Sequence, residues 1–410
     1  MRAKLDQQPA RVAWLIAAAL IMAMVGIGCG GDDDGGGGEE GALQKVGEPE
    51  GQLNLIAWPG YVADPWKSDF EKETGCQIKL REAGTSDEMV DQMRTGQWDG
   101  VSASGNASLR LVAGDDVDPV NLDLVPNYET VFEDLKDQPY NTVDGVHYGV
   151  PHGRGANLLM WNTGAVKPDP KSWGVILDPV QASKHKGEIS VYDDSVYIAD
   201  AALYLKAHQP DLGIDNPYEL DDEQFNAAVD LLKEQQPNVG EYWIDAAKQI
   251  QSFANEDVVV GTTWQYQYFA LQAEAAPVAA SPASQGFLPE EGATGWSDTW
   301  MISSQAAHPN CMYLWMDHIV SPLANAEVAQ YFGEAPAQSK SCEPATFEKA
   351  TKALEFPPDP KFCDNYHAAD PGFWDKVYYW ITPVADCGDD RGEVCKDNNE
   401  WVSAWTEIKG

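Results

Sequence analysis

The fold is decided by residues 53–103, which read LNLIAWPGYVADPWKSDFEKETGCQIKLREAGTSDEMVDQMRTGQWDGVSA. Three short apolar runs, over 53–58, 76–80 and 98–103, alternate with two segments whose apolar residues recur at helical spacing. Gly75 ends the first helical segment, because glycine readily adopts the left-handed conformation that closes a helix. The alternation predicts a β-α-β-α-β unit, which begins an open α/β sheet.

Four side chains with binding chemistry follow the first and third of these strands: Trp58, Tyr61, Ser104 and Asn106. Ligands of open α/β sheets lie beyond the carboxyl ends of the strands. All four are therefore candidate binding residues. The competing interpretation is that the two aromatic rings belong to the core and that Ser104 caps a helix.

A second informative stretch is EEGATGWSDTWM at residues 290–301. Trp296, Asp298 and Trp300 alternate along it, and alternate residues of a strand share one face. Trp296 and Asp298 should therefore project together. The pair suits an organic cation, because the ring face attracts its charge and the carboxylate accepts its N–H bonds. The plainer alternative is that the tryptophans are core residues and that Asp298 caps a turn.

Two later strands end at further candidates. The strand at 187–192 leads into Asp194, ahead of a predicted helix, and the strand at 258–263 leads into Trp264. Asp194 is a helix N-cap by default, but a turn between strand and helix also faces the cleft above the sheet. Arg154, flanked by glycines, is a candidate contact for a ligand carboxylate or phosphate. The alternative for Arg154 is an ion pair with a protein carboxylate.

Length and charge restrict the class of protein. The 410 residues are enough for two domains with their own cores. A formal net charge of −38 argues against a body that binds nucleic acid or anionic lipid, since both need a basic surface. The histidines are scattered and no cysteine pair has metal-ligand spacing, so we expect neither metal nor cofactor. Walker and GxSxG motifs do not occur, which argues against an enzyme; a glycosidase with paired carboxylates is the enzymatic alternative.

The N-terminus has the layout of a bacterial lipoprotein signal. Basic residues precede an apolar run over 12–27, and small residues then precede Cys29. We expect residues 1–29 to be a signal peptide and Cys29 to carry a lipid, which would be the chain's contact with the membrane; an uncleaved anchor helix is the alternative. Residues 30–50 are rich in Gly, Asp and Glu and should form a flexible tether. The protein is expected to be exported, either anchored to the outer face of the cell membrane or periplasmic.

Six cysteines follow the predicted signal: Cys76, Cys311, Cys342, Cys363, Cys387 and Cys395. Export permits disulfides, although several pairing schemes are open from the sequence. The local pairs Cys342–Cys363 and Cys387–Cys395 are the simplest, and Cys76–Cys311 then remains. We expect the Trp- and Tyr-rich tail to pack against the body and to be pinned by the last pair.

Several of these segments together resemble one family. The segments are Trp58-Pro59-Gly60-Tyr61-Val62, Phe70-Glu71-Lys72-Glu73-Thr74-Gly75, residues 99–104, Tyr192-Asp193-Asp194, Trp264 and Gly295-Trp296-Ser297-Asp298. In order and spacing they resemble the polyamine (spermidine/putrescine) solute-binding proteins of bacterial ABC transporters, over residues 52–340. The combination of Trp264 with Trp296-x-Asp298 is the part most particular to polyamine binders.

The resemblance implies two α/β lobes, each built on an open sheet, linked by crossing strands and closing on ligand by a hinge motion. We assign residues 51–150 and 297–340 to lobe 1, and residues 151–296 and 341–410, with the disulfide-pinned tail, to lobe 2. The implied function is to capture a polyamine between the lobes and deliver it to ABC permease subunits. The alternative is the same receptor binding an amino-acid-like or anionic solute through Arg154.

The resemblance also implies a set of ligand contacts. It places aromatic walls at Trp58, Tyr61, Trp264 and Trp296, ammonium-binding carboxylates at Asp194 and Asp298, and a polar contact at Ser104. The chain departs from the family pattern at three further candidate contacts: Asn106 replaces an aromatic residue, Tyr197 replaces a second carboxylate, and Glu334 replaces a tyrosine. Because one negative charge is lost and another gained elsewhere, the length and valence of the cation stay open.

Overall fold

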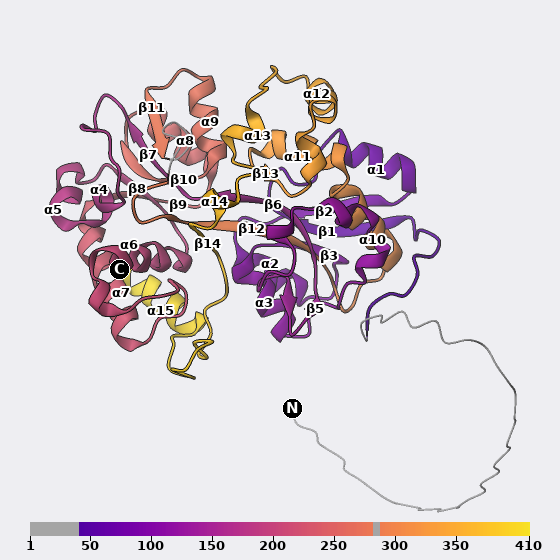
Figure 1. Cartoon of the computed structure of the whole chain (residues 1–410), viewed down its shortest axis with the longest axis horizontal. Coiled ribbons are helices and arrows are strands. Elements are labelled where there is room, and N and C mark those ends of the chain that lie inside the picture. The colour runs from indigo at the N-terminus through magenta and orange to yellow at the C-terminus, as the bar shows by residue number, and fades with distance from the viewer. Residues whose placement is uncertain (1–40, 282–287) are drawn as a thin grey trace, which may run out of the picture. The chain divides into compact units, whose positions relative to one another are not determined.

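Two β-sheets organise the chain (Figure 1). The computed structural model describes residues 41–281 and 288–410. The first sheet contains β1 (Gln52–Ala57), β2 (Gln77–Glu82), β3 (Gly100–Ala103), β6 (Val150–Ala156), β12 (Ala293–Ile302), β13 (Ala335–Pro336) and β14 (Val377–Tyr379). The second sheet contains β7 (Leu158–Asn162), β8 (Ile189–Tyr192), β9 (Val239–Trp243), β10 (Val260–Thr263) and β11 (Val278–Ser281). A short hairpin consists of β4 (Thr142–Val143) and β5 (Val146–His147).

The helices follow the sequence patterns closely. Those up to the middle of the chain are α1 (Trp66–Thr74), α2 (Ser86–Met93), α3 (Gly105–Ala113), α4 (Gly174–Leu177), α5 (Pro179–Ala182), α6 (Ile198–His208) and α7 (Asp222–Gln235). The later ones are α8 (Ala246–Ala254), α9 (Gln265–Ala273), α10 (Pro309–Ile319), α11 (Pro322–Phe332), α12 (Pro344–Ala353), α13 (Phe362–Asn365), α14 (Pro371–Trp374) and α15 (Asn398–Lys409). In the described part of the chain, none of these helices combines the length and the apolar character needed to cross a membrane.

The first sheet grows from the predicted β-α-β-α-β unit. Its order is β13-β6-β12-β3-β1-β2, with β14 paired to β12; β1 pairs in parallel with β2 and β3, and β12 runs antiparallel to β3 and β6. α1 ends at Gly75, whose φ of +79° lies in the left-handed region, as predicted. Trp66 and Phe70, one helical turn apart on α1, are fully buried in the core beside this sheet.

The second sheet has the order β11-β7-β10-β8-β9. Asn157 alone separates β6 of the first sheet from β7 of the second, and the chain returns from β11 to β12. The two sheets are thus linked by crossing strands, as the expected two-lobe α/β fold requires. The predicted boundaries at 150/151 and 296/297 cut through β6 and β12, which both belong to the first sheet. We therefore propose lobe boundaries at the ends of these strands, 156/157 and 292/293.

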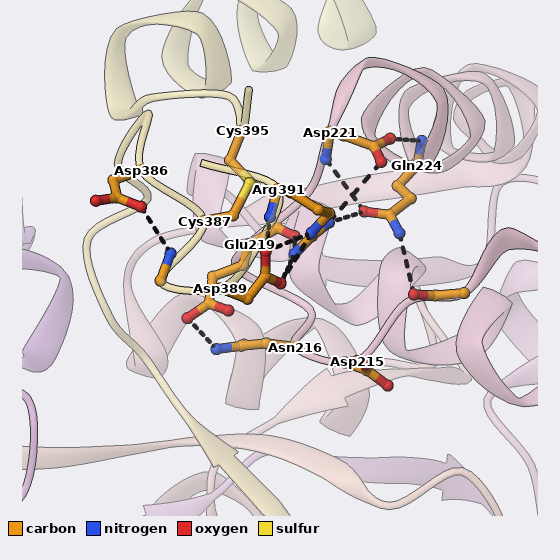
Figure 2. A network of polar contacts seen from close by, with 12 residues as sticks. Asp215, Asn216, Glu219, Asp221, Gln224, Asp386, Cys387, Asp389, Arg391 and Cys395 are labelled. Carbon is orange, nitrogen blue, oxygen red and sulfur yellow. Dashed lines mark hydrogen bonds and ion pairs between the residues drawn. A yellow bond between two sulfur atoms is a disulfide. The ribbon is translucent and has the colours of Figure 1, made fainter. Parts of the chain in front are cut away.

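The C-terminal tail contacts both sheets. β14 pairs with β12 of the first sheet, whereas α15 packs on α7 beside the second. Between them, Cys387 and Cys395 close a loop that Figure 2 shows against the chain entering α7. Arg391 of this loop donates to Gln224 Oε1 at 2.9 Å and to the Glu219 carbonyl at 3.1 Å. The tail is thus packed against the body and closed by a disulfide, but it contacts both sheets and not the second alone.

The three predicted disulfides are all present: Cys76–Cys311, Cys342–Cys363 and Cys387–Cys395. The predicted signal peptide, Cys29 and the tether as far as residue 40 lie outside the described residues. The prediction of a tether up to Glu50 is wrong for its last ten residues. Glu50 accepts hydrogen bonds from the backbone of Asn310 and Cys311 at 3.0 and 2.9 Å, because its carboxylate satisfies amides at the start of α10.

Candidate ligand-binding site

A narrow aromatic pocket lies where both sheets end. It is lined by Trp58, Tyr61, Ser104, Trp264, Trp296, Asp298, Phe332 and Trp380. The first sheet supplies most of the lining from the ends of β1 and β3 and from β12, whereas Trp264 follows β10 of the second sheet. Six of these eight residues were predicted from the sequence. The cavity volume of about 20 Å³ corresponds to little more than one water molecule, so a ligand requires the lobes or the rings to part.

Asp298 is the carboxylate of the pocket, and it is only 2% exposed. It accepts hydrogen bonds from Tyr61 Oη at 2.5 Å and from Ser104 Oγ. Burial raises the pKa of Asp298 to about 6, although these two hydrogen bonds oppose the shift. Among the described residues, no lysine, arginine or histidine forms an ion pair with it. Asp298 is therefore a buried acceptor without a direct ion-pair partner, although a charge on nearby His152 would favour its ionised form. An incoming cation supplies such a partner.

A second buried carboxylate, Glu334, lies behind Tyr61. Tyr61 Oη is 3.2 Å from Glu334 Oε2, and His152 Nε2 is 3.2 Å from Glu334 Oε1. The Trp300 indole N–H donates to His152 Nδ1 at 2.9 Å, and an indole nitrogen can only donate. His152 Nδ1 is therefore the acceptor of this bond, and its Nε2 faces Glu334 Oε1. Glu334, predicted as a ligand contact, meets Tyr61 and lies within ion-pair distance of His152, and it does not line the pocket.

The two glycines of β6 make room for these groups. A Cβ on Gly155 would lie 2.4 Å from a Trp296 ring carbon, and one on Gly153 would lie 2.5 Å from the Glu334 carboxyl carbon. Both distances are far below van der Waals contact. The spacing of two residues places both glycines on the face of β6 that meets the pocket residues.

Gly155→Ala should displace the Trp296 ring and lower the free energy of unfolding by about 1–3 kcal/mol, as overpacking does. The matched control is Gly372→Ala, where an added Cβ meets only Asp370 Oδ1, at an ordinary 3.6 Å. Thermal unfolding followed by tryptophan fluorescence compares the two variants. Equal stability of both would contradict the close packing of Trp296 on β6.

Arg154 is committed to contacts within the protein. It is 1% exposed, donates to Asp134 Oδ2 at 2.7 Å, and lies 4.3 Å over the Trp374 ring. Its position between two pocket-facing glycines directs it to the opposite face of β6. The predicted alternative, in which Arg154 binds a ligand anion, is therefore disfavoured, and the ion pair with a protein carboxylate is what the structure shows.

Three other predicted contacts lie outside the pocket lining. Asn106 accepts a hydrogen bond from Ser86 Oγ at 2.8 Å within the first lobe. Asp194 accepts one from the Val196 amide at 2.9 Å, which is the N-cap role considered as its default; burial raises its pKa to about 6. Tyr197 is 2% exposed and accepts a hydrogen bond from Gln235 at 2.9 Å. Packing inside each lobe holds these side chains away from the pocket.

Two lining residues were not predicted. Phe332, the last residue of α11, meets the Trp296 ring edge-on at a centroid distance of 5.8 Å. Trp380, just after β14, donates its backbone N–H to the Gly295 carbonyl at 2.7 Å. Its own carbonyl passes so near Gly105 that a Cβ there would lie 1.8 Å away. A glycine between two predicted contacts, Ser104 and Asn106, is a weak signal, and it does not reveal which distant segment approaches.

Comparisons with known proteins agree with this architecture. A putrescine/cadaverine-binding protein of Pseudomonas aeruginosa is 23% identical over 316 residues, covering 75% of this chain and 85% of that protein. The solved structure of a spermidine/putrescine ABC transporter substrate-binding protein of Streptococcus pneumoniae has a TM-score of 0.63, with 16% identity, covering 87% and 97% of the two chains. The solved structure of an Agrobacterium tumefaciens binding protein in complex with glucopine has a TM-score of 0.61, with 16% identity, covering 88% of this chain and 100% of that one. These structures share the fold and differ in the ligand their names give.

A match to a family model shows which family the chain belongs to. The model of the bacterial extracellular solute-binding proteins matches residues 66–355, which include both sheets except for β1 and β14. This is a family of receptors and not of enzymes. The chain, with its two α/β lobes and its aromatic pocket between them, belongs to the bacterial extracellular solute-binding proteins.

Proposed function

We propose that this protein is the receptor of an ABC importer and that it captures a polyamine, a putrescine- or spermidine-like cation. The observation that carries the proposal is Asp298, a buried carboxylate that forms no direct ion pair with any of the described residues. An alkylammonium group supplies the missing charge, and the ring faces of the surrounding tryptophans attract it. The polyamine-binding names of the Pseudomonas and Streptococcus proteins support the same ligand.

The energies of these contacts suit a receptor. A charge-assisted hydrogen bond contributes about 1.5–3 kcal/mol, and a ring face contributes roughly 0.5–2 kcal/mol to a bound cation. Two such bonds and three ring faces sum to about 5–12 kcal/mol before the cost of association and of parting the lobes. A micromolar Kd, which is the affinity we expect of this receptor, corresponds to about 8 kcal/mol net and therefore requires contacts toward the upper end of this range.

A second candidate ligand class rests on unpaired donors. The indole N–H groups of Trp58, Trp296 and Trp380 are buried and have no acceptor among the described residues. A polyamine offers them no strong acceptor, whereas an amine that also bears a carboxylate does. An unmade hydrogen bond of a buried group costs about 1–3 kcal/mol. An amino-acid-like or opine-like solute is thus the alternative, held through these indoles and not through Arg154.

A thermal-shift panel distinguishes the two classes. Putrescine, cadaverine and spermidine form one arm; lysine, 4-aminobutyrate and an opine form the other. At a ligand concentration of one hundred times Kd, binding stabilises the fold by about 2.7 kcal/mol, which moves the unfolding midpoint clearly. We expect the shift in the first arm. A shift confined to the carboxylate-bearing arm would refute the polyamine assignment but would leave the assignment of the fold unchanged.

Binding should weaken in acid. Asp298 must be ionised to bind an ammonium group, and burial raises its pKa in the free protein to about 6. The apparent Kd is therefore expected to be flat above about pH 7 and to rise about tenfold between pH 7 and pH 5, as the ionised fraction falls. Calorimetric titrations at both pH values measure the ratio. An unchanged Kd would mean that Asp298 does not hold the cation.

We also propose that Cys29 is lipidated after removal of residues 1–28, so that the receptor stays at the outer face of the membrane. The support is the order of basic, apolar and small residues before this cysteine. Incorporation of labelled palmitate tests the proposal: Cys29→Ala should abolish it. Equal labelling of both proteins would refute the anchor.

A further inference from the structure

A second small cavity adjoins the ligand pocket. It shares two of its walls, Trp264 and Trp380, with that pocket, and its remaining lining includes Asp200 and Asn157. Its volume is about 10 Å³, which accommodates a single group of the size of water, and an ammonium group has that size. The two indole rings therefore form a partition between Asp298 on one side and Asp200 on the other.

Asp200 resembles Asp298 in its surroundings. It lies in the first turn of α6, is 4% exposed, and accepts a hydrogen bond from Thr294 Oγ1 at 2.8 Å. In the described part of the chain it has no lysine, arginine or histidine as an ion-pair partner. Burial raises its pKa to about 7. A buried carboxylate that meets neutral groups and borders a cavity is costly to keep charged, and a cation in that cavity would offset the cost.

One face of β12 connects the two carboxylates. Thr294, Trp296 and Asp298 alternate along this strand without a register shift between them, so their side chains share a face. Thr294 holds Asp200, and Trp296 and Asp298 line the ligand pocket. Four residues of strand advance by about 13 Å. The two carboxylates are therefore separated by a distance of the order of 10 Å.

The gap between the two indole rings is nearly wide enough for a methylene chain. The Trp264 and Trp380 ring centroids are 6.5 Å apart with their planes at 59°. A carbon chain between two rings requires about 7–8 Å, since each contact takes about 3.5–4 Å. The two rings must therefore part slightly for a methylene chain to pass between them.

We propose, on the basis of the polyamine function above, that Asp200 forms a second cation subsite and that the receptor prefers a long polyamine reaching from Asp298 past Trp264 and Trp380 to Asp200. Length selects the ligand. With bonds of about 1.5 Å in a zigzag, an extended putrescine spans roughly 6 Å between its terminal nitrogens, and an extended spermidine spans roughly 11 Å. Only the longer amine bridges the two carboxylates.

The first test uses the wild-type protein. Calorimetric titration compares α,ω-diaminoalkanes of four, five, six, eight and ten carbons with the monoamine of each length. At eight carbons, where the second nitrogen reaches Asp200, we expect the diamine to bind at least tenfold more tightly than its monoamine. At four carbons we expect the difference in affinity to be less than threefold. The monoamines correct for methylene burial, which increases with length in both series. If the ratio of diamine to monoamine affinity is the same at every length, the proposal that Asp200 forms a second cation subsite is wrong.

The second test uses Asp200→Asn, with the exposed Asp230→Asn on α7 as the control for loss of one charge. We expect Asp200→Asn to weaken spermidine binding by 10- to 100-fold and putrescine binding by less than threefold. Unchanged selectivity would refute the inference while putrescine binding still supports the proposed function. Failure of every amine to bind the wild type would refute both. If Asp200→Asn does not fold, the wild-type length series decides alone.

Discussion

Asp298→Asn is expected to weaken the binding of putrescine or spermidine by about 100- to 1000-fold. The substitution keeps the size of the side chain and removes its charge. The ammonium group would then be buried without a counter-charge, and breaking a buried ion pair in this way costs about 3–5 kcal/mol. Asn can still accept a hydrogen bond, which places the expected loss toward the lower end of that range.

The same substitution should not destabilise the free protein, which separates lost binding from lost folding. Burial raises the pKa of Asp298 from 3.8 to about 6, so the folded state disfavours its ionised form. This cost is absent below about pH 4 and fully present above about pH 6, where it amounts to roughly 2–3 kcal/mol. At pH 7 the Asn variant is expected to unfold at the same temperature as the wild type or above it. A variant that binds within threefold of the wild type would exclude Asp298 as the cation site.

Removal of the Cys76–Cys311 disulfide should have the largest effect on stability. The two cysteines are 235 residues apart, whereas Cys387 and Cys395 are 8 apart. In the chain-entropy account the longer closed loop restricts the unfolded chain more, by about 5 kcal/mol against about 2.5 kcal/mol. Both sulfurs of the first pair are fully buried, so alanine, which buries no hydroxyl, is the suitable replacement.

The difference in unfolding free energy can be measured by urea unfolding of two double variants. One is Cys76→Ala/Cys311→Ala and the other is Cys387→Ala/Cys395→Ala. We expect the first variant to lose the larger part of its unfolding free energy while retaining the pocket residues in place. The second should mainly loosen the loop around Arg391, which also contacts Gln224 and Glu219 directly. A smaller loss for the first pair than for the second would contradict the entropic argument.

The sequence predicted the pieces of the pocket that depend on local periodicity. Gly75 as a helix end and the three strands around it follow from short-range rules. Trp296 and Asp298 could be placed on one face because a strand alternates, and both line the pocket. Trp58, Tyr61, Ser104 and Trp264, which follow strand ends, are there as well, because ligand sites of open sheets gather at those ends.

The sequence could not predict contacts that depend on packing between distant segments. Trp380 reaches the pocket because β14 pairs with β12, more than 80 residues earlier, and no local pattern specifies that pairing. Arg154 lacked any visible partner, yet Asp134, twenty residues before it, takes its charge. Asn106 and Tyr197 were both predicted as ligand contacts. Asn106 meets Ser86 within its own lobe, whereas Tyr197 meets Gln235 and also lines the second cavity.

The most direct test of the polyamine assignment is a pair of calorimetric titrations with putrescine and 4-aminobutyrate at pH 7.5. The two compounds have nearly the same length and differ in one end, which is an ammonium in the first and a carboxylate in the second. The pocket around Asp298, as described above, predicts saturable one-to-one binding of putrescine with a Kd of the order of micromolar, and binding of 4-aminobutyrate weaker by at least 100-fold. Tighter binding of 4-aminobutyrate would contradict it and would assign the pocket to a zwitterion held by the unpaired indoles.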